Sequence, residues 1–275
     1  MIGETVPEAL AALEIDLLMQ AVGRAYALDT GRLPRPLVET TAAMLVRRSG
    51  ARSVSGLVER VLHEPAFGRE ALQALCACDV RLFHDWVFHR NVREQVVPWL
   101  RTYPYSAVWL AECGAGGEVY SFAILLAECG LLDRVTIHAT DRDPVLLAHA
   151  RQGAVPLGVL KEAQASYRRA GGTGSLSAHF VRQGDRGVLS EALQRRIVWS
   201  NYDLGTGHSF NEFHFIVCRA ALDELPAAGH RVLRLLTDSL SACGLLALNG
   251  DQRRILDPNR YRPWRPGTGI YQRTA

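Results

Sequence analysis

The sequence predicts an α/β protein built on a doubly wound parallel sheet, with a helical domain in front of it. Apolar residues recur at helical spacing from residue 7 to residue 100, without a strand pattern. Beyond residue 100, short apolar runs alternate with helical segments, as in a parallel sheet covered by helices. A length of 275 residues suits one such domain and a smaller appendage, which we place at residues 98–275 and 1–97.

The front of the chain is expected to form helices only. Glycine and proline residues separate the helical segments, and the third segment ends before Pro65. The predicted helices cover residues 7–22, 37–46, 54–62, 68–76 and 91–100.

Strands and helices are predicted to alternate in the rest of the chain. Short apolar runs suited to strands buried on both faces occur at residues 107–111, 135–139, 213–218 and 244–248. Helical patterns separate them at residues 119–129, 144–152 and 226–242. Residues 156–200 interrupt this alternation with short strand patterns at 177–181 and 197–199, and we interpret them as a small inserted β-subdomain.

Composition favours an ordinary globular protein and excludes several classes. A net charge of +3 gives no reason to expect a nucleic-acid partner, and no run of about 18 apolar residues is available for membrane insertion. The 6 cysteines lack the spacing of zinc ligands, so no metal site is expected. Because the N-terminus has no signal-peptide profile and the thiols lie in apolar runs, the expected location is the cytoplasm.

A glycine-rich turn follows the first predicted strand and opens the next helix. Its sequence is Glu112-Cys-Gly114-Ala-Gly116-Gly117-Glu118, and its glycines allow the backbone to approach a ligand closely. In dinucleotide-binding proteins such a turn cradles a pyrophosphate, which the carboxylates of Glu112 and Glu118 would repel. The same carboxylates suit a sulfonium ligand that carries an ammonium group. The turn therefore favours S-adenosylmethionine over NAD.

Asp141 ends the second strand segment, where an acidic side chain can accept hydrogen bonds from both ribose hydroxyls. The stretch Asp-Arg-Asp-Pro over residues 141–144 is also typical of a helix N-cap, so Asp141 could instead cap the following helix. Taken with the glycine-rich turn, the interpretation of Asp141 as a ligand residue is favoured.

At these residues the sequence resembles the CheR family, the chemotaxis receptor glutamate methyltransferases. Residues 108–121, Val-Trp-Leu-Ala-Glu-Cys-Gly-Ala-Gly-Gly-Glu-Val-Tyr-Ser, are similar to the family's Trp-Ser-Ala-Gly-Cys-Ser-Thr-Gly-Glu-Glu-Pro-Tyr-Ser. Residues 139–141 match its Ala-Thr-Asp, and residues 215–219 resemble its Phe-Asp-hydrophobic-Ile-Cys-Arg-Asn. Residues 82–85, Leu-Phe-His-Asp, resemble its Phe-Phe-Arg-Asp/Glu, and residues 270–273 its closing Val-Tyr-Arg-Lys. The resemblance covers nearly the whole chain.

The resemblance implies a Rossmann-like methyltransferase domain with a small inserted β-subdomain, behind an N-terminal helical domain. It implies S-adenosylmethionine as the methyl donor and S-adenosylhomocysteine as the product. Glu118 and Asp141 match positions that hold the cofactor's amino-acid end and ribose, and Asp203 matches a position near the adenine. The predicted cofactor-binding set is Glu112, Gly114, Gly116, Glu118, Asp141, Asp203 and Cys218.

The sequence departs from the family at positions that lie beside the methyl group in its members. The family's Arg after Phe-Phe is His84 here, its Tyr near the end of Cys-Arg-Asn-Val-x-Ile-Tyr-Phe is Glu224, and its Asn after Cys-Arg is Ala220. The family's receptor-facing, arginine-rich helix retains only Arg47 and Arg48, which weakens the receptor-docking interpretation.

These departures bear on the methyl acceptor. An ionised carboxylate needs no base and is oriented by Arg or Tyr, whereas a hydroxyl or an amine must lose a proton to a base such as His or Glu. We therefore predict His84 and Glu224 as catalytic residues. Each has an alternative: His84 as a partly buried surface histidine, and Glu224 as part of a helix start. His89 and His138 are assigned structural roles.

Three functions stay open at this point. The first is a methyltransferase whose acceptor, a small metabolite or a protein, presents an oxygen or nitrogen other than the chemoreceptor glutamate. The second is a protein-glutamate O-methyltransferase of a chemotaxis-like pathway. The third is a cofactor-binding regulatory protein that has lost catalysis.

Overall fold

The computed structural model describes residues 6–78, 80–205, 208–209, 211–219, 229–249 and 256–274. It consists of two compact units, Met1–Val80 and Arg81–Ala275. The division falls at residue 80/81, whereas the boundary expected from the sequence, at 97/98, assigns residues 81–97 to the helical front. Those residues lie in the second unit because helix α5 (Trp86–Asn91) packs against helices α7 (Gly117–Glu128) and α9 (Leu157–Arg169).

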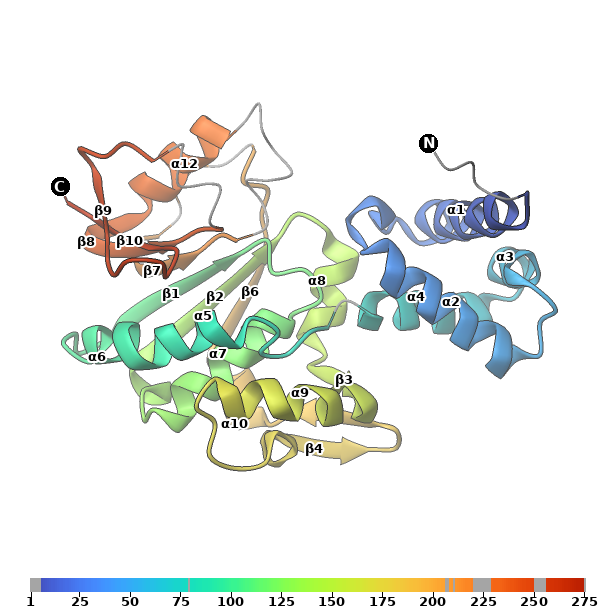
Figure 1. Ribbon diagram of the computed structural model, residues 1–275, viewed down its shortest axis with the longest axis horizontal. Helices are drawn as coiled ribbons and strands as arrows, with labels where there is room; N and C mark the ends of the chain where they lie inside the picture. Colours follow the sequence, from blue (N-terminus) through green and yellow to red (C-terminus); the bar gives the residue numbers. More distant parts are fainter. Residues whose placement is uncertain are drawn as a thin grey trace. The chain divides into compact units, whose positions relative to one another are not determined.

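The first unit is helical, and its described residues contain no strand. Its helices are α1 (Val6–Tyr26), α2 (Arg35–Ser49), α3 (Val54–His63) and α4 (Pro65–Cys78). Helix α3 packs against both α1 and α4, and α2 packs against α4 (Figure 1). Fully buried leucines from all four helices form the core: Leu18, Leu45, Leu57 and Leu75.

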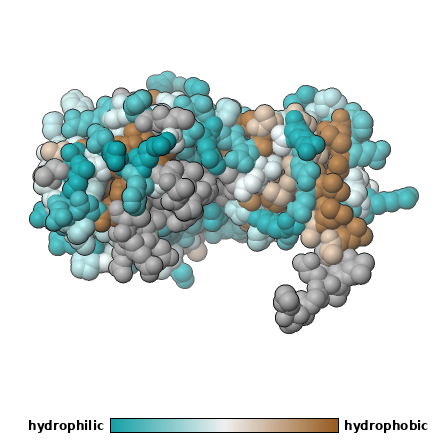
Figure 2. Space-filling view, turned by 90° about the horizontal axis from the view of Figure 1, so that it is seen from above, coloured by the Kyte–Doolittle hydropathy of each residue, from teal (hydrophilic) through white to brown (hydrophobic). Residues whose placement is uncertain are grey.

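Helix α1 carries apolar side chains on its outer face as well as in the core. Leu10, Leu13 and Leu17 are exposed and recur at i, i+3 and i+7, so they follow one line along the helix. Figure 2 shows apolar side chains gathered in a stripe on this unit.

The second unit is built on a seven-stranded sheet of order β6-β2-β1-β7-β8-β10-β9. The first five strands are parallel, and β10 and β9 are antiparallel to their neighbours (Figure 1). The strand bounds are β1 Ser106–Ala111, β2 Val135–Asp141, β6 Ile197–Asn201, β7 Phe213–Val217, β8 Leu240–Ala247, β9 Tyr261–Pro263 and β10 Ile270–Arg273. Strand order reverses between β1 and β7, as in a Rossmann-like sheet, so the predicted fold class is confirmed.

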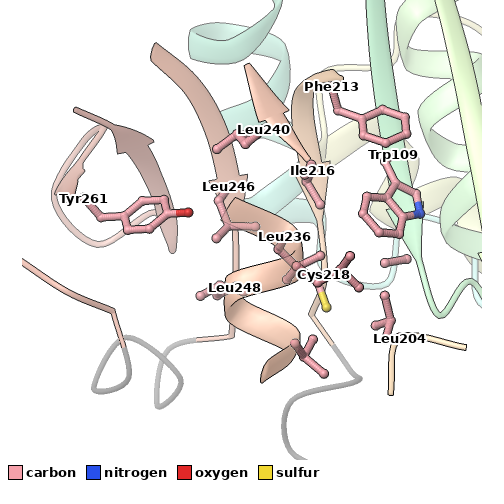
Figure 3. Packing of buried hydrophobic residues seen from close by; sticks show 13 residues of the cluster. Trp109, Leu204, Phe213, Ile216, Cys218, Leu236, Leu240, Leu246, Leu248 and Tyr261 are labelled. Atoms are coloured by element: carbon pink, nitrogen blue, oxygen red, sulfur yellow. The ribbon is translucent and has the colours of Figure 1, made fainter. Parts of the chain in front are cut away.

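Helices surround this sheet. After α5 come a π-helical turn η2 (Val92–Val96) and α6 (Val97–Leu100), and α7, α8 (Pro144–Arg151) and α12 (Gly229–Asp238) follow strands. Helix α7 has an almost entirely buried middle because it lies between the sheet and α5. Figure 3 shows part of the core, where Trp109 packs with Phe213, and Ile216 and Leu246 lie near Leu236 of α12.

Between β2 and β6 the chain forms a second, smaller sheet, which is antiparallel and has three strands in the order β3-β5-β4. Its strands are β3 Ala154–Pro156, β4 Phe180–Gln183 and β5 Arg186–Leu189, with α9 packed against it. The predicted strand at 197–199 belongs instead to β6, at the edge of the main sheet, where Ile197 pairs with Ile137. The sequence does not show which of the two sheets a strand joins, because β4 and β6 are both short and partly exposed.

Hydrogen bonds and an ion pair at Glu128 connect the inserted subdomain to α7. The Glu128 carboxylate, at the end of α7, accepts hydrogen bonds from Arg93 Nη2 at 2.5 Å, from His179 Nε2 at 3.3 Å and from the Tyr167 hydroxyl. Burial raises the pKa of Glu128, but the hydrogen bonds from His179, Tyr167 and Arg93 outweigh it and lower that pKa to about 2. The folded state therefore favours the ionised carboxylate.

The Glu128 carboxylate should make the stability of the fold sensitive to acid. Because the folded state lowers the pKa of Glu128, this group stabilises the fold by about 3 kcal/mol above pH 4.5. This contribution disappears as pH falls from about 4.5 to about 2. Glu128→Gln removes the ionisable group, so its unfolding midpoint in urea should be lower than that of the wild type at neutral pH and less sensitive to acid. Equal slopes of stability against pH in both proteins would contradict the prediction.

Candidate functional site

The predicted cofactor residues converge on one edge of the sheet. The glycine-rich turn follows β1, Asp141 ends β2, Asp203 follows β6, and Cys218 follows β7. Since these strands are parallel neighbours, their carboxyl ends lie together around the reversal between β1 and β7. Topology alone therefore brings these four segments together.

The glycine-rich turn depends on glycine for two different reasons. Gly116 has φ +89°, and a Cβ there would lie 2.9 Å from the ring and hydroxyl of Tyr120 and 3.0 Å from Cβ of Ala150. Tyr120 itself is a core residue, 1% exposed, rather than part of an open site. At Gly117, the first residue of α7, a Cβ would lie 2.7 Å from both the backbone N and O of Arg81. This close approach brings residues 81–85 to the N-terminus of α7.

The segment after Arg81 is held in a specific conformation. Phe83 is fully buried with φ +51°, and its amide donates to the Ser121 Oγ of α7 at 2.9 Å. This left-handed conformation is uncommon for a phenylalanine, so tertiary contacts must maintain it. The next residue, His84, is thereby placed beside Glu118, with its Nδ1 4.0 Å from Glu118 Oε2.

Asp141 organises the turn from the neighbouring strand. It is fully buried; its Oδ2 accepts the Gly114 amide at 2.7 Å and its Oδ1 accepts the Asp143 amide at 2.9 Å. The N-cap of α8 is Asp143, which accepts from the amides of Val145 and Leu146. The capping role considered for Asp141 thus belongs to Asp143, and ribose binding by Asp141 stays a prediction.

Glu118 lies at the centre of a charged cluster. Its Oε2 is 3.6 Å from His89 Nε2 and 4.0 Å from His84 Nδ1, and its Oε1 is 3.8 Å from Arg219 Nη1. Both oxygens are buried, and neither accepts a hydrogen bond from a described residue. A buried carboxylate without a donor is costly, so this group is well suited to a ligand that brings donors of its own.

Arg219 is the cation of this cluster, and the sequence alone did not assign it a role. Its Nη2 forms an ion pair with Asp85 Oδ2, and its guanidinium carbon lies 4.1 Å from the centre of the Phe88 ring. Burial raises the pKa of Asp85, but the Phe88 amide and the Arg219 guanidinium together hold it below its ordinary value. The position of Arg219 directly after the β7–Cys218 stretch was the available sequence signal.

The two histidines of the cluster differ. The His84 side chain is 42% exposed, and its pKa lies below its ordinary value mainly because of burial, despite the opposing charge of Glu118. His89 is fully buried, and its Nδ1 lies 2.8 Å from the Asp85 carbonyl oxygen. A carbonyl can only accept, so Nδ1 of His89 carries the proton. His84 is therefore neutral near pH 7 and open to solvent, whereas His89 is anchored in the interior.

The remaining predicted residues lie at the edge of the site or outside the described residues. Glu112 is partly exposed with φ +54°. Asp203 is exposed, and its Oδ1 accepts the Gly205 amide at 2.7 Å. Cys218 is fully buried in the apolar cluster of Figure 3, so a contact between its side chain and a cofactor stays a prediction. Glu224 and Ala220 lie outside the described residues.

The part of the chain that the structure describes offers neither a metal centre nor a membrane-spanning helix. Nowhere in it do three or more His, Cys, Asp or Glu side chains gather as metal ligands would. None of its helices combines the length and apolar character that a membrane span needs.

Known proteins are similar to this chain over the same region. The model of the CheR methyltransferase SAM-binding domain matches residues 83–261. A Pseudomonas putida protein named as the methyltransferase Cher3 is 33% identical over 241 residues, 87% of this chain and 88% of that protein. A chemotaxis protein methyltransferase of Listeria innocua is 30% identical over 155 residues, 56% of each chain.

Solved structures also match parts of the chain. The StiE O-methyltransferase domain matches with a TM-score of 0.39 and 14% identity, over 74% of this chain and 59% of its own. The glycopeptide N-methyltransferase MtfA, solved with S-adenosylmethionine, matches with a TM-score of 0.33 and 16% identity, over 56% of this chain and 48% of its own.

Proposed function

The chain belongs to the CheR family of S-adenosylmethionine-dependent methyltransferases, and we propose that it methylates an oxygen or nitrogen acceptor with His84 as the general base. The acceptor is a hydroxyl or an amine of a small metabolite or of a protein, rather than a chemoreceptor glutamate. The observation that carries the proposal is His84 itself, a solvent-accessible histidine with a lowered pKa beside Glu118.

The residues of the cluster fit the amino-acid end of S-adenosylmethionine. Among the described residues the two buried oxygens of Glu118 have no donor, and an α-ammonium group supplies donors. The guanidinium of Arg219, 3.8 Å from Glu118, provides donors for the α-carboxylate. When bound, the cofactor supplies a methyl group on a positively charged sulfur, which needs only an aligned nucleophile. Asp141 and Asp203 are the proposed partners of the ribose and the adenine.

His84 is better suited to accept a proton from the methyl acceptor than to bind an acceptor carboxylate. Its lowered pKa leaves the imidazole neutral near pH 7, so it can accept a proton from a hydroxyl or an amine. The Glu118 carboxylate at 4.0 Å would stabilise the imidazolium that forms. A neutral imidazole gives little attraction to an acceptor carboxylate, and Arg219, paired with Asp85 through Nη2, is assigned here to the carboxylate of the cofactor.

The acceptor class can be tested with methyl-tritiated S-adenosylmethionine and fractions of a cell extract. We expect protein-dependent transfer into a product that survives mild alkali, as methylated hydroxyls and amines do. Tritium released by alkali as volatile methanol would identify a carboxylate ester and overturn the proposed acceptor. That result would favour the alternative function, a protein-glutamate methyltransferase, to which the name of the Listeria relative points. Cofactor binding without any transfer would favour a regulatory protein.

His84→Gln tests the base directly on the labelled fraction. We expect kcat to fall about a hundredfold while the dissociation constant of S-adenosylmethionine changes little. In the wild type, kcat/KM should fall as pH decreases through a pKa below 6.5, and this acidic limb should be absent in the variant. Unchanged turnover in His84→Gln would contradict the role of His84.

A further inference from the structure

We propose that Asp85 is a positioning residue that holds the Arg219 guanidinium away from Glu118, so that the two can bind the opposite charges of the cofactor's amino-acid end. This inference rests on the proposed assignment of Glu118 and Arg219 to that end of the cofactor. Asp85 itself would touch neither the cofactor nor the acceptor.

Three contacts hold Arg219 in one orientation. Its Nη2 is paired with Asp85 Oδ2, its guanidinium lies over the Phe88 ring at 4.1 Å, and its carbonyl accepts a hydrogen bond from the Asn249 side chain. Asp85 is fixed in turn, because its Oδ1 accepts the Phe88 amide at 3.0 Å and caps α5. Asp85 and Phe88, both at the start of α5, thus bind the guanidinium of Arg219 from two sides.

The free side of the guanidinium faces Glu118. Arg219 Nη1 lies 3.8 Å from Glu118 Oε1, too far for a hydrogen bond, and makes none with a described residue. Arg219 and Glu118 side chains are only 21% and 20% exposed, so solvent screens their attraction weakly. Without Asp85, Glu118 would be the remaining carboxylate within 4 Å of the guanidinium among the described residues. A direct hydrogen bond between Arg219 and Glu118 would then occupy the donors and acceptors that an ammonium and a carboxylate require.

Asp85→Asn separates this role from the capping role. Asparagine is as good an N-cap as aspartate, so the start of α5 should be preserved while the charge that holds Arg219 is lost. Two ligands then report on different parts of the site. S-adenosylhomocysteine and 5′-methylthioadenosine share the thioether and the nucleoside, and only the first carries the amino-acid group.

By calorimetry, we expect Asp85→Asn to weaken S-adenosylhomocysteine about tenfold and to leave 5′-methylthioadenosine within about twofold. Glu128→Gln is the matched control, because it also removes the carboxylate partner of a partly buried arginine, Arg93. Glu128 ends α7, whereas Glu118 lies in the first turn of that helix. That control should lower stability and change neither affinity. Equal weakening of both ligands, or of neither, in Asp85→Asn would overturn the positioning role. If Asp85→Asn does not fold, Asp85→Ser retains a capping side chain and gives the same comparison.

Arg219→Met distinguishes the two proposals. If it leaves the affinity for S-adenosylhomocysteine unchanged, the assignment of Arg219 to the amino-acid end fails, and the inference about Asp85 fails with it. If Arg219→Met weakens that ligand and Asp85→Asn does not, only the positioning role is wrong. In the Arg219→Met background, Asp85→Asn should have no further effect on either ligand.

Discussion

Glu118→Gln is expected to weaken the binding of S-adenosylmethionine about a hundredfold, or about 2.7 kcal/mol. Glutamine keeps the size of the side chain but loses the charge that attracts an ammonium group, and hydrogen bonds to charged groups are about twice as strong as neutral ones. The effect should be large because both oxygens of Glu118 are buried and without donors among the described residues. Isothermal titration of S-adenosylmethionine against the wild type and the variant measures it.

The controls for this variant use a second ligand and a second glutamate. 5′-Methylthioadenosine lacks the ammonium group, so its affinity should change little in Glu118→Gln. Glu191→Gln removes a carboxylate that is 77% exposed and paired with Arg195 in a short helix, and it should leave both affinities unchanged. An affinity of Glu118→Gln for S-adenosylmethionine within about threefold of the wild type would refute the assignment.

Gly117→Ala is expected to destabilise the second unit by about 2–3 kcal/mol and to reduce cofactor affinity at least tenfold. The added Cβ would lie 2.7 Å from the backbone N and O of Arg81, and backbone atoms cannot rotate away as a flexible side chain can. Relief requires residues 81–85 to move off the start of α7. That movement displaces His84 from Glu118 and Asp85 from Arg219, so stability and binding should fall together.

Gly158→Ala is the matched control for this substitution. Gly158 also lies in the first turn of a helix, α9, and a Cβ there would meet nothing within 4 Å. Alanine has the higher helix propensity, so this variant should be as stable as the wild type or slightly more stable. Urea unfolding and calorimetry on both variants give the comparison. A Gly117→Ala protein with wild-type stability and affinity would show that the contact with Arg81 is unimportant.

Much of the fold was predictable because its signals are local. The runs at 107–111 and 135–139 became β1 and β2, and the pattern at 119–129 became α7 within two residues at its start. Periodicity cannot show which strands are neighbours, however. The strand at 197–199 was therefore grouped with the insertion, although it pairs with β2 in the main sheet. Likewise, the sequence did not separate the role of Asp141 from that of Asp143, because either could cap α8.

The sequence by itself determined the strand–turn–helix unit at residues 107–129, its acidic glycine-rich turn and the resemblance of these residues to the CheR family. Each of these depends on neighbours in the chain, through apolar spacing, turn conformation and charge. Only the tertiary structure placed His84 and Arg219 beside Glu118 and paired Arg219 with Asp85, which is 134 residues away in the chain. Their meeting depends on β7 lying beside β1 and on Gly117 admitting the Arg81 backbone, and no local pattern encodes a contact between distant segments.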